Sequence, residues 1–272
     1  PDAYACVRPR LPGGSYPFGE LCGAGVAYKL AWRLCTMACR SERVTEQLRA
    51  LLVGDLLAFA SLGVIADVVP LVGENRVIAY YGLRRVRGAT NEGLRALVKA
   101  SHLDSQEVSE EDVGFKLGPR LNACGRMGHA RDAVELLTTA TGARAGQIAA
   151  ELTRQNDERR RVERAIFEQA CEMVEREGMH RDDCRAIVLA HPGWNAGVVG
   201  IVCSRLVERY GRPALLMCEH EGLCHGSGRS IEGYSLHAGL EACAEHLTGF
   251  GGHDMAAGLR LESARLAAFR EA

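Results

Sequence analysis

The stretch Gly118-Pro119-Arg120-Leu121-Asn122-Ala123-Cys124-Gly125-Arg126 places two arginines and an asparagine among residues that break helices. A planar guanidinium matches a pair of phosphate oxygens. Arg120 and Arg126 can face one anion only if the chain turns between them, as Gly125 permits. We therefore expect a loop or helix entry that grips an anion through Arg120, Asn122 and Arg126. The alternative is that these arginines pair with nearby surface carboxylates.

Three other segments complete a set of short motifs. They are Ala66-Asp67-Val68-Val69-Pro70-Leu71 upstream, and Gly226-Ser227-Gly228-Arg229-Ser230 and Gly251-Gly252-His253 downstream. In this order the four motifs resemble those of the RecJ-like, single-strand-specific exonucleases of the DHH phosphoesterase superfamily, and the resemblance covers nearly all 272 residues. RecJ-like enzymes also carry an Asp-rich motif and an Asp-His-His motif, and neither occurs here. We therefore expect this chain to be a fragment of a longer protein.

The resemblance implies an α/β fold in three parts. Residues 1–142 correspond to the C-terminal portion of the DHH catalytic domain, 143–180 to a connector helix, and 181–272 to a smaller α/β DHH-associated domain that binds substrate. The sequence itself has a long helical pattern without proline over residues 143–178, polar on every side at 153–161. A helix of that kind is typical of a bridge between domains.

Short apolar runs alternate with helical patterns after this connector, as expected for an α/β domain. The predicted strands are residues 186–190, 214–218 and 257–261, and the predicted helices are 16–34, 75–99, 198–210, 236–247 and 263–270.

The composition limits the class of protein. The 272 residues are 47% hydrophobic and 25% charged, which suits about two soluble domains. No segment has the roughly 18 uninterrupted apolar residues of a membrane helix, so no membrane contact is expected. The net charge of −1 gives no general attraction to nucleic acid, and binding must come from a local patch. Eleven cysteines without Cys-x-x-Cys spacing indicate buried thiols in a reducing compartment, here the cytoplasm, rather than zinc ligands.

Asp67 follows an apolar run, where an ionised carboxylate is costly without a cation or hydrogen-bond donors. From the residues alone, a helix-end carboxylate held by backbone amides fits as well as a metal ligand. The resemblance implies that Asp67 is catalytic and binds the divalent ions, Mn²⁺ or Mg²⁺, which clamp the attacking water and the leaving oxygen in phosphodiester hydrolysis. One aspartate cannot hold two ions. The chain alone is therefore expected to bind metal weakly and to be inactive.

Residues 191–200 join a predicted strand to a predicted helix through small side chains. Such a turn directs free backbone N–H groups at an anionic guest, although packing alone also produces it. The candidate substrate contacts here are Trp194, Asn195 and Gly197, and Trp194 fits a core position equally well. RecJ-like proteins often have histidine where this sequence has Asn195. Asparagine keeps the hydrogen bonding but lacks the titratable ring.

The Gly226–Ser230 segment combines glycines, hydroxyls and a guanidinium, the components of a backbone nest for phosphate. In RecJ-like enzymes the similar segment contacts the 5′ end of the strand. The resemblance therefore assigns the 5′-phosphate and adjoining nucleotide to Ser227, Arg229, Ser230, Gly251, Gly252 and His253.

The resemblance implies a 5′-to-3′ exonuclease that hydrolyses single-stranded DNA with divalent metal ions and releases mononucleotides, in DNA repair and recombination. Two alternatives remain. One is a DHH-family phosphodiesterase of short oligonucleotides or cyclic dinucleotides, whose associated domain also carries Gly-Gly-His; the 118–126 motif and the long connector argue against it. The other is a non-catalytic nucleic-acid-binding relative that has lost its metal site.

Overall fold

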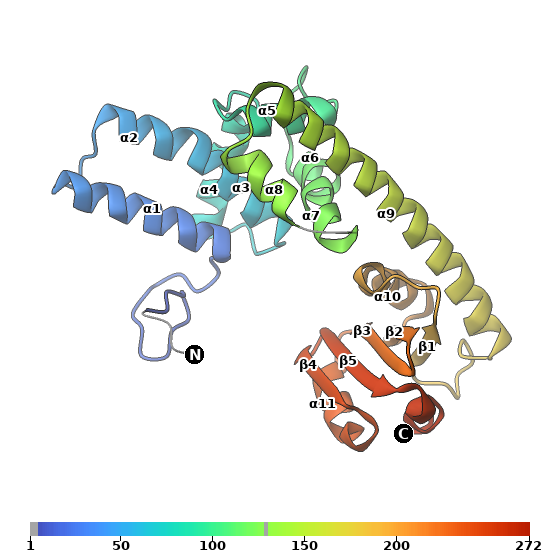
Figure 1. Ribbon diagram of the computed structural model, residues 1–272. Coiled ribbons are helices and arrows are strands. Elements are labelled where there is room, and N and C mark those ends of the chain that lie inside the picture. Colours follow the sequence, from blue (N-terminus) through green and yellow to red (C-terminus); the bar gives the residue numbers. More distant parts are fainter. Residues whose placement is uncertain (1–4, 128–129) are drawn as a thin grey trace. The chain divides into compact units, whose positions relative to one another are not determined.

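The computed structural model describes residues 5–127 and 130–272 (Figure 1). These residues form two compact units, which divide between Asn156 and Asp157. The described elements of the first unit are helices, whereas the second contains a five-stranded sheet. The predicted α/β class is therefore confirmed, with the sheet confined to the C-terminal part.

The first unit is built from short helices. They are α1 (Gly23–Cys39), α2 (Glu46–Leu51), the π-helical turn η1 (Leu52–Leu56), α3 (Leu57–Ala66), α4 (Gly73–Val86), α5 (Glu92–Ala100), α6 (Glu110–Asp112), the π-helical turn η2 (Val113–Leu117), α7 (Gly118–Met127), α8 (Arg131–Thr138) and the start of α9 (Gly142–Arg176). The single helix predicted over 75–99 is wrong. It is two helices, because the Asn91 side chain accepts from the Leu94 N–H and starts α5 anew.

The core of this unit lies where α3, α5 and α8 meet the start of α9. Leu94, Leu97, Leu136 and Leu152 are fully buried there, and each such side chain contributes about 1.5–3 kcal/mol. A Cβ at Gly93 would lie 1.6 Å from the Leu136 carbonyl oxygen. Helices α5 and α8 can therefore approach this closely only because position 93 has no side chain.

Residues Glu46–Ala66 are long and apolar enough to cross a membrane, with a mean hydropathy of 1.9. In the structure this run bends at Gly54, whose φ and ψ of −98° and −108° are not helical. Most of α3 is buried against its neighbours in the first unit. A core helix passes the same test of length and hydropathy, so the run is weak evidence for a membrane span.

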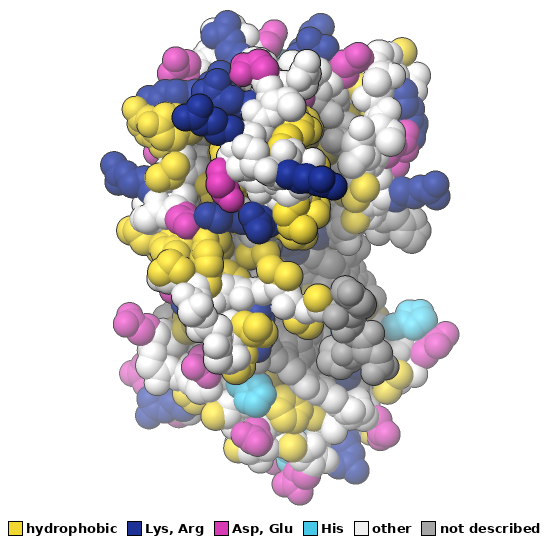
Figure 2. All heavy atoms as spheres, turned by 90° about the vertical axis from the view of Figure 1, so that its left-hand side faces the viewer, with side chains coloured by type: hydrophobic (Ala, Val, Ile, Leu, Met, Phe, Trp, Pro, Cys, Tyr) yellow, Lys and Arg dark blue, Asp and Glu magenta, His cyan; other side chains and the backbone are white. Residues whose placement is uncertain are grey.

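One face of the first unit presents hydrophobic and basic side chains side by side (Figure 2). Helices α1 and α4 line a groove of about 920 Å³ on this unit. Trp32, Val77 and Tyr81 lie in the groove and are 38%, 55% and 56% exposed. Lys29 and Arg85 also line it.

The second unit is an α/β sandwich. After α9 it contains β1 (Ile187–His191), α10 (Ala196–Tyr210), β2 (Ala214–His220), β3 (Leu223–Arg229), α11 (Leu236–Ala242), the 3₁₀ turn η3 (Ala244–His246), β4 (Gly249–His253), β5 (Ala256–Glu262), the 3₁₀ turn η4 (Ser263–Arg265) and α12 (Leu266–Glu271). The strand order is β1-β2-β3-β5-β4. β1 and β2 are parallel, and the other neighbours are antiparallel.

The two faces of the sheet are covered differently. On one face, α10 packs over β2 and β3, and the Cys203 thiol donates to the Ser227 carbonyl at 3.1 Å. On the other, Leu236 of α11 packs with Leu215, Met217 and Leu259 in a buried cluster. Figure 1 shows α10 and α11 on opposite sides of the strands. The α10 face is left open over β5 and β4.

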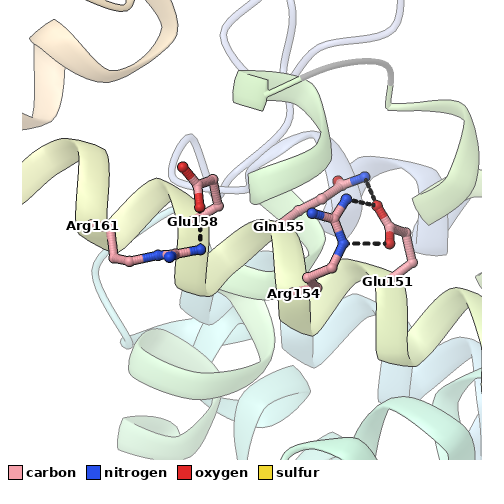
Figure 3. Close-up of polar contacts among 5 residues, drawn as sticks. All are labelled: Glu151, Arg154, Gln155, Glu158 and Arg161. Carbon is pink, nitrogen blue, oxygen red and sulfur yellow. Dashed lines mark hydrogen bonds and ion pairs between the residues drawn. The ribbon is translucent and has the colours of Figure 1, made fainter.

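The long helix predicted over 143–178 is present as α9, which has 35 residues and spans about 50 Å. Its polar middle is stabilised by pairs three and four residues apart, shown in Figure 3. The Arg154 guanidinium donates twice to Glu151, at 2.8 and 2.6 Å, and Gln155 donates to the same carboxylate. Arg161 pairs with Glu158. These donors hold the pKa of Glu151 down at about 2.

Candidate functional site

Ser227 and Arg229 lie on the α10 face of β3, beside the second turn of α10. A Cβ built at Gly200 would lie 3.2 Å from Arg229 Nη2 and 3.3 Å from Ser227 Oγ. Both donors therefore lie close to the same point, and a larger residue at position 200 would displace them. Arg229 Nη1 also donates to the Gly228 carbonyl at 2.8 Å, which orients the guanidinium.

The sheet register brings the Gly-Gly-His segment alongside these two residues. Arg229 pairs with Ala256, and Ala256 pairs with His253 on the next strand. Directly opposite residues in an antiparallel ladder point to the same face. The side chains of Arg229 and His253 therefore emerge on one face of the sheet, separated by the small Ala256.

Gly252 has a backbone that favours glycine. Its φ is +147°, and a Cβ there would lie 2.3 Å from the Ala256 carbonyl oxygen. Gly252 thus makes the close β4–β5 pairing possible. Gly251 to His253 lie in β4, and Gly226 to Arg229 lie in β3. The expected nest at 226–230 is wrong, because Leu223–Arg229 is paired along its whole length with β2 and β5.

Ser230 follows β3 and is 4% exposed. Its hydroxyl donates to the Tyr234 carbonyl at 2.8 Å, and its N–H donates to the Met255 carbonyl at 3.0 Å. The role of a substrate contact is therefore not supported for Ser230. It fastens the turn after β3 and so holds Arg229 in place.

The loop before α10 is held by Gln169 of α9. Trp194 is 3% exposed, and its indole N–H donates to Gln169 Oε1 at 2.8 Å. His191 Nε2 lies 2.8 Å from the Gln169 amide nitrogen, and the Gly193 N–H donates to His191 Nδ1 at 3.0 Å. Trp194 is thus a core residue rather than a substrate contact. Gln169 had no signal in the sequence that would have identified this role.

Asn195 begins α10 as its N-cap. Its side-chain oxygen accepts from the Gly197 N–H at 2.8 Å. That N–H was expected to face an anionic guest, and in the structure the chain itself satisfies it. Asn195 and Gly197 therefore shape the start of α10.

In the first unit, Asp67 is the C-cap of α3 and is exposed. Its N–H donates to the Gly63 carbonyl at 3.0 Å, and the next residue, Val68, has a positive φ of 55°. Asn75, which is fully buried, donates to the carbonyls of Pro70 at 3.0 Å and Glu20 at 2.8 Å. Asn75 therefore pins the loop that follows Asp67, a role that the sequence did not suggest.

The segment 118–126 forms most of α7, so of the loop and the helix entry that the sequence predicted, the structure has the helix entry. Pro119 lies in the first turn of α7, directly after η2, where the wider π-helical turn accommodates a residue without an N–H. Arg120 donates to Thr153 Oγ1 at 3.2 Å and to the Lys116 carbonyl at 2.8 Å. Arg120 thus ties α7 to α9, and an anion grip by this residue is not supported.

Asn122 and Arg126 are four residues apart on α7 and share an exposed face. Asn122 lines a cavity of about 230 Å³ together with Ala66, the last residue of α3. The structure therefore brings the end of α3, where Asp67 lies, next to the polar face of α7.

The chain was compared with family models, with known proteins and with solved structures. A model of the DHHA1 domain matches residues 183–272. The chain is 45% identical over 265 residues to the single-stranded-DNA-specific exonuclease RecJ of Bacillus subtilis, covering 97% of this chain and 32% of the relative. It is 36% identical over 279 residues to RecJ of Escherichia coli, covering 100% of this chain and 48% of the relative. The chain is RecJ-like.

The structure of RecJ from Thermus thermophilus in complex with Mn²⁺ matches with a TM-score of 0.80 and 31% identity, over 94% of this chain and 36% of that one. The same protein in complex with Mg²⁺ matches with a TM-score of 0.77 and 31% identity, over 97% of this chain and 38% of that one. This RecJ-like chain thus spans a third to a half of the length of the relatives named here.

The two Thermus thermophilus RecJ structures are complexes with Mn²⁺ and with Mg²⁺. Asp67 has the oxygen ligands that such ions prefer. Within residues 5–127 and 130–272, however, no three His, Cys, Asp or Glu side chains gather into a possible metal site. The described part of this RecJ-like chain therefore does not form a complete divalent-metal site, and the metal-ligand role of Asp67 stays a prediction.

Proposed function

We propose that the complete protein is a metal-dependent exonuclease that hydrolyses single-stranded DNA from the 5′ end and releases mononucleotides, and that the second unit holds the 5′-phosphate. The observation that carries this proposal is the pair formed by Ser227 and Arg229 against Gly200. A guanidinium and a hydroxyl that approach one point are the donors that suit a phosphate.

Electrostatics supports an anionic ligand at this point. Arg229 is half-buried, and its guanidinium lies against Gly200 of α10. No carboxylate forms an ion pair with Arg229 among the described residues. A bound phosphate would offset this positive charge.

The remaining residues of the second unit position this site. Gly200 leaves room for the two donors, Ser230 fixes the end of β3, and Gln169 holds the loop that begins α10. His253 emerges on the same face as Arg229 and is exposed, so it can donate to a phosphate or sugar oxygen.

In the first unit, Asp67 would contribute one carboxylate to divalent cations, which supply a polarised water and stabilise the leaving oxygen when bound. Asn122 and Arg126, on the exposed face of α7 near the end of α3, are proposed to contact the DNA backbone. The names of the RecJ relatives support a single-stranded DNA substrate, and the ions in the solved structures support divalent cations.

Exchange of Arg229 for alanine in the complete protein tests the proposal. Loss of the guanidinium should weaken binding of a 5′-phosphorylated oligonucleotide by about tenfold and leave binding of the 5′-hydroxyl form within twofold. Fluorescence anisotropy with both oligonucleotides measures this. Arg185→Ala is the control for the loss of an arginine, because Arg185 is exposed and precedes β1 at the opposite edge of the sheet. Equal loss for both oligonucleotides would contradict a 5′-phosphate site at Arg229.

A comparison of substrates tests the reaction itself. The complete protein should degrade a long single strand in preference to a dinucleotide or a cyclic dinucleotide. Preference for the short substrates would indicate the oligonucleotide phosphodiesterase, and binding without hydrolysis in Mn²⁺ would indicate a non-catalytic relative.

We also propose a cytoplasmic location. It is supported by the eleven cysteines of the described chain, all of which are free thiols. Such unpaired thiols are typical of reducing compartments.

A further inference from the structure

The part of the sheet that α10 leaves uncovered adjoins the Ser227–Arg229 site. We call it the open face, and it comprises the α10-side residues of β3, β5 and β4 in three cross-strand rows. The rows are Arg229, Ala256 and His253; Ser227, Gly258 and Gly251; and His225, Arg260 and Gly249. Outside Ser227, Arg229 and Ala256, which are half-buried, these residues are exposed.

Packing within the described chain does not require the glycines of the open face. A Cβ at Gly249 or Gly251 would meet nothing within 4 Å, and one at Gly258 would meet only backbone oxygens at 3.8 and 4.0 Å. None of the three has a positive φ. Their small size therefore leaves the sheet surface accessible to a ligand from outside.

The open face is cationic. Arg229 lies in the first row and Arg260 in the third, with His253 and His225 beside them. Among the residues of β3, β4 and β5, the one carboxylate is Glu262, which pairs with Leu223 beyond the third row. The Arg260 side chain makes no ion pair or hydrogen bond within the described residues. It is thus available to an anionic partner.

The spacing favours separate phosphates for the two arginines. Arg260 follows Ala256, the partner of Arg229, by four residues, which is about 13 Å along the strand. Two cations this far apart, with the glycines Gly258 and Gly251 between them, suit an extended polyanion better than one compact anion.

We infer that the open face carries the sugar–phosphate backbone of single-stranded DNA away from the Ser227–Arg229 site, and that Arg260, with His225, contacts a phosphate farther along the same strand. This inference rests on the proposed function and extends it from the terminal phosphate to a longer contact. It gives the second unit a role in substrate length as well as in recognition of the 5′ end.

Exchange of Arg260 for alanine in the complete protein tests the inference through length and salt. Binding of a 5′-phosphorylated 12-mer should weaken about five- to tenfold. The slope of log K against log salt should fall by about 0.7, the value for one phosphate contact on a single strand. Binding of a 5′-phosphorylated dinucleotide, which ends before the third row, should stay within twofold. Arg185→Ala, the matched loss of an exposed arginine, should change neither oligonucleotide.

A second variant tests whether DNA binding requires the glycines of the open face. Gly258→Leu places a bulky side chain where the structure has open space, so the protein should stay folded by circular dichroism and thermal unfolding. The 12-mer should bind at least about tenfold more weakly, because the backbone can no longer approach the sheet. Gly211→Leu is not a matched control, because its φ is positive. Gly146→Leu is matched, since that glycine is also open and lies on α9.

The outcomes separate this inference from the proposed function. If Arg229→Ala weakens the 12-mer and the Arg260 and Gly258 variants bind like wild type, the open face does not contact DNA, while the 5′-phosphate site stands. If Arg229→Ala also leaves binding unchanged, the proposed function of the second unit fails as well. Equal weakening of dinucleotide and 12-mer by Arg260→Ala would overturn the assignment of a distant phosphate.

Discussion

The two units differ in how their candidate residues are held. In the second unit, hydrogen bonds between β3, β5 and β4 fix Arg229, His253 and Arg260 on one face, although the sequence separates them by up to 31 positions. In the first, Asp67 lies at an exposed helix end without other clustered ligands among the described residues. The comparison teaches that strand pairing alone can gather the candidate residues of the second unit on one face, whereas the described residues of the first do not gather a metal site.

The largest effect should come from Asp67, which would separate chemistry from binding. In the complete protein, Asp67→Ala should lower the rate of DNA hydrolysis by about a thousandfold or more, because a lost metal ligand removes several kcal/mol of transition-state stabilisation. Binding of a 5′-phosphorylated oligonucleotide should change less than twofold.

Nuclease assays in Mn²⁺ and anisotropy without metal measure the two effects. Calorimetry should also show weak Mn²⁺ uptake by the 272-residue chain. Tight, stoichiometric uptake would show that the chain forms a complete metal site. It would contradict the difference between the two units described above.

The next effect concerns how the first unit holds its aspartate. Asn75→Ala removes two hydrogen bonds to backbone carbonyls, so unfolding of the first unit should become easier by about 1–3 kcal/mol. Urea denaturation measures this change. Hydrolysis should fall more than DNA affinity, since the loop after Asp67 is loosened and the second unit is untouched. A loss of affinity equal to the loss of rate would show that the two units are not separable in function.

A smaller effect is expected at Gln169 in the second unit. Gln169→Leu leaves the buried Trp194 indole N–H without its acceptor, at a cost of about 1–3 kcal/mol, and should weaken oligonucleotide binding a few-fold. The fluorescence of Trp194, measured in a Trp32→Phe background, should shift to the red. Gln169→Glu retains the acceptor and should restore both signals. A red shift in Gln169→Leu without weaker binding would show that the loop is not a positioning element.

The smallest effect should appear at Glu151 on α9. Its pKa of about 2 in the folded protein lies below its unfolded value, so its contribution to stability is present above about pH 4.3 and is lost as the pH falls towards 2. The side chain is 37% exposed, which limits the contribution to a few tenths of a kcal/mol. Thermal unfolding should show Glu151→Gln less stable than wild type at pH 6 and equal to it at pH 2. A constant difference at both pH values would contradict the ion pair.

Much of the second unit could be predicted from the sequence, because β1, β2 and β5 are apolar runs and α10 has a helical pattern. β3 and β4 were missed for a physical reason. Their Gly-Ser-Gly and Gly-Gly segments lack the alternation of a strand, and they are extended because β5 pairs with both. Propensity was overridden by tertiary pairing.

The candidate site was predicted in part. Ser227, Arg229 and His253 lie on one face, as a shared ligand requires. Trp194, Ser230 and Arg120 instead make contacts within the chain, which depend on Gln169, Tyr234 and Thr153, residues far from them or without a distinctive pattern. Arg260 and Asn75 were not identified, since an isolated arginine or asparagine has no signal until the register or the burial is known.

Hydrogen–deuterium exchange with and without a 5′-phosphorylated single strand tests the central claim most directly, because it compares both units in one experiment. The account predicts slower exchange at the end of β3, residues 226–230, and along β4, residues 249–253, when DNA is bound. Unchanged exchange at both segments, with protection confined to the first unit, would contradict substrate recognition by the second.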